Sequence, residues 1–175
     1  MDRAELAKRI YSASHLTGEF TLRSGVVSNE YFDKYRFEAD PGLLHTIAVA
    51  MAGMVPLGID ALAGLELGGI PLVTMLSQVT GVPARFVRKE AKTYGTCQLA
   101  EGGELAGARL LIVEDVITSG GAVLDAVAAL RERGAIAERV VCVIDRESGG
   151  VEKLGEAGLA LDALFTMSEL KAAAG

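Results

Sequence analysis

The stretch LLIVEDVITSGGA, residues 110–122, decides which fold this chain can adopt. It begins with a run of apolar residues, continues through two acids, and closes on Gly120 and Gly121 before a helical pattern that ends near Gly134. Continuous apolar strands, in contrast to alternating ones, are typical of a sheet that helices cover on both faces. A strand that turns into a helix through a glycine-rich loop therefore predicts a parallel α/β unit.

The same order of strand, turn and helix recurs on both sides of this stretch. Strands are expected at residues 61–67, 83–87 and 139–145, and helices over residues 72–81 and 122–134. In such sheets ligands bind beyond the carboxyl ends of the strands, so the residues that follow each strand are the candidates for function.

The N-terminal third has a different pattern. Apolar residues at helical spacing predict helices over residues 2–15 and 41–55, the second with Asp40 as N-cap and Pro41 at its first position. Between them, residues 18–37 alternate aromatic, polar and glycine positions and predict a short hairpin or cap. We therefore expect one α/β domain over residues 1–175, with a mostly parallel central sheet flanked by helices.

Composition excludes several classes of protein. The chain has 175 residues, of which 50% are hydrophobic, which suits one domain with a buried core. A net charge of -6 argues against nucleic-acid binding, which needs a dominant basic face. The N-terminus is interrupted by charges, and no apolar run approaches the roughly 18 residues needed to span a bilayer. Cys97 and Cys142 form no CxxC pair, so zinc and disulfides are not expected, and reduced thiols fit a cytoplasmic protein.

The glycine-closed loop has the chemistry of an anion site. Backbone amides, the hydroxyls of Thr118 and Ser119, and the positive end of the following helix can together bind a phosphate. Two better-known loops are excluded, because no Gly-Lys-Ser or Gly-Lys-Thr occurs and because the acids precede the glycines. The expected contacts are Val116, Ile117, Thr118, Ser119, Gly120, Gly121 and Ala122.

Glu114 and Asp115 come directly before this loop. Carboxylates in that order suit a sugar phosphate, because they can bind ribose hydroxyls or a hydrated magnesium ion while the amides hold the terminal phosphate. The alternative is a plain strand-loop-helix junction with two exposed acids.

Residues 113–121, VEDVITSGG, resemble the phosphoribosyl pyrophosphate (PRPP) motif of type I phosphoribosyltransferases and are close to its orotate phosphoribosyltransferase version. The resemblance implies the type I fold, a PRPP site on the loop, and catalytic roles for Glu114 and Asp115. It also implies Mg²⁺ as cofactor, carried by PRPP with no direct protein ligand and at most a water-mediated contact to Asp115.

A basic segment lies between two expected strands. Arg88, Lys89 and Lys92 fall within five residues, and cations placed there can stabilise the charge that builds on a pyrophosphate leaving group. The alternative is a solvated basic turn. The letters RKEAK also resemble the mobile catalytic loop of orotate phosphoribosyltransferases, which implies Lys92 as the catalytic cation and Arg88 and Lys89 as pyrophosphate binders. Tyr94 is expected to contact PRPP, although many members of the family have histidine there.

Two further points follow from the same resemblance. The family supplies this loop partly across a dimer interface, so a homodimer with shared active sites is expected. Residues 65–71 align with the pyrophosphate loop of the family, in which some members have lysine where this chain has Gly68.

Arg146 follows the strand at residues 139–145, at the same sheet edge as the phosphate loop. Arginine matches a planar carboxylate with two parallel hydrogen bonds, although a surface arginine is the alternative. The letters IDRESGG resemble the orotate-binding segment of the family, which implies that Arg146 and Thr118 bind orotate. FTLRSG, residues 20–25, resembles the hood over the base, which adds Arg23, Tyr31 and Phe32; core packing is the alternative for the two aromatic residues.

The sequence thus predicts an orotate phosphoribosyltransferase-like enzyme whose substrates are PRPP and orotate, in pyrimidine (UMP) biosynthesis. Transfer to another base and a PRPP-sensing regulator remain as alternatives, because the phosphoribosyl loop does not identify the acceptor. His15 and His45 are placed on helical segments and interpreted as structural.

Overall fold

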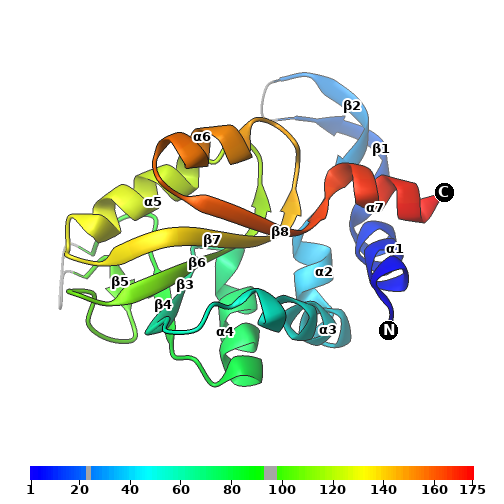
Figure 1. Ribbon diagram of the computed structural model, residues 1–175. Coiled ribbons are helices and arrows are strands. Elements are labelled where there is room, and N and C mark those ends of the chain that lie inside the picture. The colour runs from blue at the N-terminus through cyan, green and yellow to red at the C-terminus, as the bar shows by residue number, and fades with distance from the viewer. Residues whose placement is uncertain (23–24, 93–97) are drawn as a thin grey trace.

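The computed structural model describes residues 1–22, 25–92 and 98–175, and its centre is a six-stranded sheet (Figure 1). The strand order is β5-β4-β3-β6-β7-β8, and all neighbouring pairs are parallel except β4 with β5. The strands are β3 (Ala61–Leu65), β4 (Ala84–Val87), β5 (Ala100–Glu101), β6 (Arg109–Ile117), β7 (Ile136–Asp145) and β8 (Ala160–Thr166).

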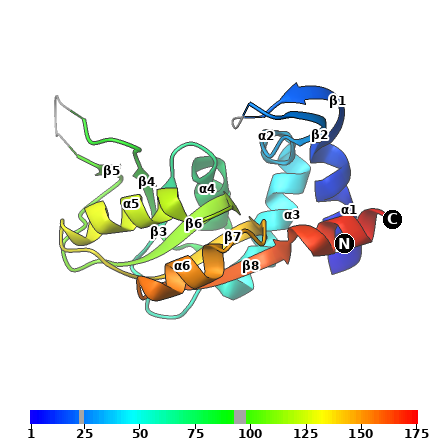
Figure 2. The same cartoon turned by 90° about the horizontal axis from the view of Figure 1, so that it is seen from above.

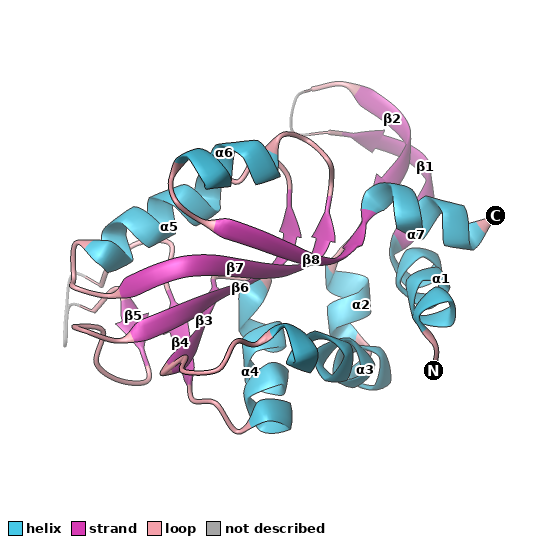
Figure 3. Cartoon of the chain, viewed as in Figure 1, coloured by secondary structure: helices cyan, strands magenta, loops and turns pink. Residues whose placement is uncertain are grey.

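Helices cover both faces of this sheet, as the continuous apolar strands predicted (Figure 3). On one face Leu111 and Val113 of β6 pack in the core formed with α3 (Pro41–Met51) and α4 (Gly69–Thr80). On the other face Leu110 and Ile112 pack in the core formed with α5 (Gly121–Arg131) and α6 (Gly150–Glu156). Since successive side chains of a strand point to opposite faces, an unbroken apolar run is what a doubly covered strand requires.

The hairpin stands beside the sheet, at the same end as both termini (Figures 1 and 2). Its strands are β1 (His15–Thr21) and β2 (Val27–Phe32), paired antiparallel, and α2 (Tyr35–Ala39) follows them. Helix α1 (Arg3–Ser14) precedes the hairpin and packs against α7 (Met167–Ala174). The Arg3 guanidinium lies 4.3 Å from the Phe165 ring centroid and donates to the Leu164 carbonyl at 2.6 Å. We call the hairpin, together with the turn that leads into α2, the hood. The C-terminal helix therefore belongs structurally with this N-terminal part of the chain.

Several boundaries differ from the expected ones for physical reasons. Strand β6 continues through both acids to Ile117, because β7 pairs with it up to Asp145. Pro41 and the Asp40 N-cap begin α3 as predicted, but the helix gives way to the 3-10 turn η1 (Ala52–Met54) before Val55. Among the described residues, no helix combines the length and the apolar character needed to cross a membrane.

Candidate active site

Asp115 lies near the carboxyl end of β6 and has no exposed surface. Its Oδ1 accepts a hydrogen bond of 2.5 Å from the Val116 backbone amide, which fixes the orientation of the carboxylate. Its Oδ2 faces Gly68, at the start of α4, so closely that a Cβ on Gly68 would overlap the carboxylate. Glycine at position 68 is thus required by this packing.

Lys34, which sequence reasoning missed, pairs with this aspartate. Its Nζ lies 2.5 Å from Asp115 Oδ2, and about a third of its side chain is exposed. Burial lowers the pKa of Lys34, but the contact with Asp115 and the charges of Asp115 and Glu114 outweigh it, so the pKa lies above its usual value. The lysine therefore stays charged. Its position two residues after the aromatic pair Tyr31 and Phe32 was the available signal.

Two further acids lie around the pair. Glu38 is 6% exposed, and burial followed by the nearby Asp115 carboxylate raises its pKa to about 9. Burial and then the charge of Asp115 also raise the pKa of Glu114 well above its usual value. We call Lys34, Glu38, Glu114 and Asp115 the acid cluster. Both Glu38 carboxyl oxygens and Glu114 Oε2 are buried without a hydrogen-bond partner, so the cluster presents unsatisfied acceptors, while Asp115 Oδ2 contacts Lys34.

The loop after β6 has the geometry of an anion site. Gly120 is the N-cap of α5 with φ of +75°, in the left-handed region that favours glycine, and a Cβ there would meet Leu154 at 3.1 Å. Thr118 and Ser119 are exposed beside it. The first amides of a helix have no intrahelical partners, so the start of α5 can donate to a phosphate.

A cavity of about 220 Å³ lies between the start of α5, which follows this loop, and the basic segment, residues 88–92. Arg88 and Lys89 line it together with Glu114 and Ala122. The sheet thus brings together cations and a phosphate loop that are more than twenty residues apart in sequence.

The cations of the basic segment are paired with an acid on β5. Lys92 Nζ forms an ion pair with Glu101 Oε1, and Arg88 Nε lies 3.3 Å from the same oxygen. The Lys89 amide donates to Glu66 Oε2 at 3.0 Å, which ties the segment to the loop after β3. Tyr94, predicted to contact PRPP, lies outside the described residues.

A second cavity, of about 180 Å³, lies between the hood and the end of β7. It brings together the predicted base-binding residues Arg146, Tyr31 and Phe32, and the Arg146 guanidinium lies 5.9 Å from the Phe32 ring centroid. Thr118 does not line this cavity. Arg23 is outside the described residues.

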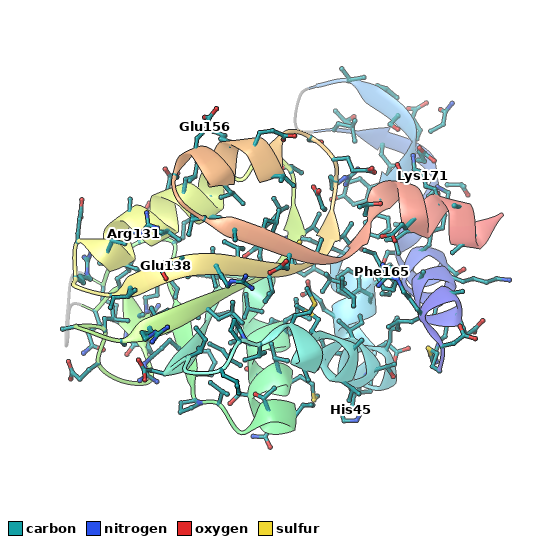
Figure 4. All side chains as sticks on the ribbon, viewed as in Figure 1. His45, Arg131, Glu138, Glu156, Phe165 and Lys171 are labelled. Atoms are coloured by element: carbon teal, nitrogen blue, oxygen red, sulfur yellow. The ribbon has the colours of Figure 1, made fainter. Side chains whose placement is uncertain are left out.

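The remaining wall of this cavity was missed by sequence reasoning. Lys171 comes from α7, beside the hairpin (Figure 4). His15, placed on a helix by its spacing, in fact begins β1 and lines the cavity, with its Nε2 2.9 Å from Glu30 Oε2. His45 does lie on a helix, α3, where it is exposed (Figure 4). No local sequence signal connects Lys171 or His15 with the sheet edge, because only the packing of α7 against α1 places them there.

Comparison with known proteins gives one consistent result. The phosphoribosyl transferase domain family matches residues 46–157. The chain is 55% identical to the orotate phosphoribosyltransferase of Nocardioides sp. over 97% of this chain and 95% of that protein. The structure of the Mycobacterium tuberculosis orotate phosphoribosyltransferase in complex with Fe(III) dicitrate is similar with a TM-score of 0.87 and 34% identity, covering 97% of this chain and 99% of that one. Its complex with PRPP has a TM-score of 0.83 and 30% identity, over 98% and 99% of the two chains.

Proposed function

The chain belongs to the phosphoribosyltransferase family and, within it, to the orotate phosphoribosyltransferases, and from this premise we propose how its own residues carry out the reaction. The enzyme transfers the phosphoribosyl group of PRPP to orotate, which gives orotidine monophosphate and pyrophosphate in pyrimidine biosynthesis. The roles of individual residues are the proposal.

The observation that carries the proposal is the pair of acids near the carboxyl end of β6, with Asp115 fully buried against Lys34 and Glu114 Oε2 buried without a hydrogen-bond partner. A buried acceptor without a donor is costly, so a ligand that brings donors stabilises it. Ribose hydroxyls are such donors. We place the ribose of PRPP beside Glu114 and Asp115 and its 5-phosphate on the loop from Thr118 to Ala122, where the start of α5 supplies amides.

We then place the pyrophosphate leaving group of PRPP beside the basic segment. Bond breaking at the ribose builds positive charge on the sugar and negative charge on the pyrophosphate. Glu114 faces the same cavity as Arg88 and Lys89, so we place the sugar beside the acids and the pyrophosphate beside these cations. We assign Lys92 as the catalytic cation, which must leave Glu101 to reach the pyrophosphate.

Orotate belongs in the cavity of about 180 Å³ at the hood. Arg146 can bind its carboxylate in a bidentate manner, while Tyr31 and Phe32 offer apolar surface to the ring. This cavity carries the specificity for a carboxylated pyrimidine.

Magnesium fits the acid cluster as an ion that arrives with PRPP. Within the described residues, no group of three or more His, Cys, Asp or Glu side chains is arranged to hold a metal. The unsatisfied Glu114 Oε2 beside Asp115 would suit an ion that keeps most of its waters and arrives with the phosphates of PRPP. When bound, it would neutralise charge on the pyrophosphate.

We also propose a cytoplasmic homodimer with shared active sites and no nucleic-acid partner. The family resemblance of the basic segment supports the shared site, the net charge of -6 supports the absence of nucleic acid, and the free, buried Cys142 thiol suits a reducing compartment. Mixing Lys92→Ala subunits with Asp115→Asn subunits tests the dimer. Shared sites predict partial recovery of activity, and two inactive partners that stay inactive would contradict them.

The function itself is tested by incubating the protein with PRPP, Mg²⁺ and a panel of free bases while each base is followed. We expect consumption of orotate, and Arg146→Ala should raise the KM for orotate about 10- to 100-fold, since a charge-assisted contact is lost. Lys153→Ala on α6, exposed, is the matched control. Turnover of another base without orotate would overturn the assignment of the acceptor.

A further inference from the structure

Lys34 is the residue of the site that the roles above leave unexplained. It lies in the turn between β2 and α2, which a hydrogen bond of 3.2 Å from the Tyr35 amide to Asp33 Oδ1 stabilises. From there its ammonium reaches across to Asp115 at the end of β6. The ion pair therefore joins the hood to the phosphoribosyl site, two parts of the chain that are 81 residues apart.

The surroundings of Asp115 show why a cation is needed at this point. Glu38, one helical turn after Lys34, and Glu114 both lie close enough to act on its charge. Gly68 cannot supply a cation because the carboxylate occupies the space of any side chain there. A fully buried carboxylate without a counter-ion is strongly unfavourable, and Lys34 is the partner that the described residues give it.

We propose that Lys34 is a positioning residue of the transferase, which holds the Asp115 carboxylate in place and aimed at the ribose before PRPP binds. The inference rests on the proposed role of Asp115. Val116 fixes one carboxylate oxygen through its amide, and Lys34 fixes the other. Because Lys34 belongs to the hood, it also couples the position of the hood, and so of the base cavity, to the acid that binds the ribose.

A residue that only stabilises the fold would behave differently from a positioning residue. Its loss lowers the melting temperature or the active fraction but leaves the KM values of the remaining enzyme unchanged. Loss of a positioning residue weakens the substrate that Asp115 contacts. The distinguishing readout is thus the KM for PRPP against the KM for orotate and against thermal stability.

The experiment compares Lys34→Met, Lys34→Arg and the control Lys8→Met, an exposed lysine on α1. Lys34→Met should weaken PRPP binding about 10- to 100-fold, by calorimetry and in the KM, the size of one lost charge-assisted contact. The KM for orotate should change less than about threefold, and Lys34→Arg, which keeps the charge, should recover most of the loss. If Lys34→Met does not fold, Lys34→Gln replaces it, with the same expectation.

A double-mutant cycle with Asp115→Asn separates this inference from the proposed function. If Lys34 acts through Asp115, Lys34→Met/Asp115→Asn should be no worse than Asp115→Asn alone. Losses that multiply, or an unchanged KM for PRPP in Lys34→Met beside a weakened Asp115→Asn, would overturn the role of Lys34. Full PRPP affinity in Asp115→Asn would instead overturn the proposed placement of the ribose.

Discussion

Glu114 of the acid cluster faces one cavity with Arg88 and Lys89 of the basic segment, but the protein holds the two regions in different ways. Asp115 is fully buried, fixed by a backbone amide, and paired with Lys34. Lys92 and Arg88 share one partner, Glu101, on the short strand β5 near the sheet edge. One half of the site is therefore built into the core, while the other rests on partly exposed ion pairs.

This difference between the acids and the cations suggests how each group serves the proposed reaction. In the proposed mechanism the buried acids, which are hard to reorient, are arranged before the substrate arrives. Ion pairs near the surface are weak, so the cations can exchange Glu101 for pyrophosphate at little cost. Preorganised acids and exchangeable cations together predict that substitutions in the two regions affect different kinetic constants.

Lys92→Ala should produce the largest effect and tests the kinetic half of the comparison. Removing one electrostatic contact to a developing charge costs about 100- to 1,000-fold in kcat, and we expect a loss of that size with a smaller change in the KM for PRPP. Steady-state kinetics with saturating Mg²⁺ measures it, with Lys153→Ala as control. A loss confined to KM would mean that Lys92 binds the ground state and does not act on the leaving group.

Gly68→Ala should have the next largest effect and breaks the preorganisation of the acids. The new methyl group must displace the Asp115 carboxylate, so the KM for PRPP should rise by about tenfold or more, with a smaller effect on the KM for orotate. Gly53→Ala is the matched control, because a Cβ there meets no atom within 4 Å. An unchanged KM for PRPP in Gly68→Ala would show that the position of Asp115 is not critical.

Glu38→Gln tests whether the cluster holds a proton. The pKa of Glu38 is about 9 when folded, against a usual 4.5, so unfolding between these values releases a proton and stability falls as pH rises through that window. Glutamine mimics the neutral acid, so the variant should match the wild type near pH 5 and exceed its melting temperature by a few degrees near pH 8. Melting curves across this range measure the difference. Equal slopes with pH would mean that Glu38 is ionised in the native protein.

How much of this could be predicted from sequence differs between the same two regions. The strand, the loop glycines and Asp115 were accessible, because a covered strand and a left-handed glycine leave local signals. Lys34 and Glu38 were not, because their importance arises only when the hood packs against β6. The partner of Lys92 was missed for the same reason, since Glu101 reaches it through the pairing of β4 with β5.

Glu101→Gln should have the smallest effect, and it tests whether the cations of the basic segment can exchange their partner. The contact with Lys92 lowers the pKa of Glu101, so the ion pair is present above the usual value of 4.5 and is lost as pH falls below it. Releasing Lys92 and Arg88 should lower the KM for PRPP by about two- to threefold at neutral pH, the modest effect of a surface ion pair. The gain should shrink at high ionic strength, where the wild-type pair is already screened. Glu104→Gln, an exposed acid near the same strand, controls for the change in net charge. A higher KM in Glu101→Gln would show instead that Glu101 holds the cations in the productive position, and the basic segment would then be as preorganised as the acids.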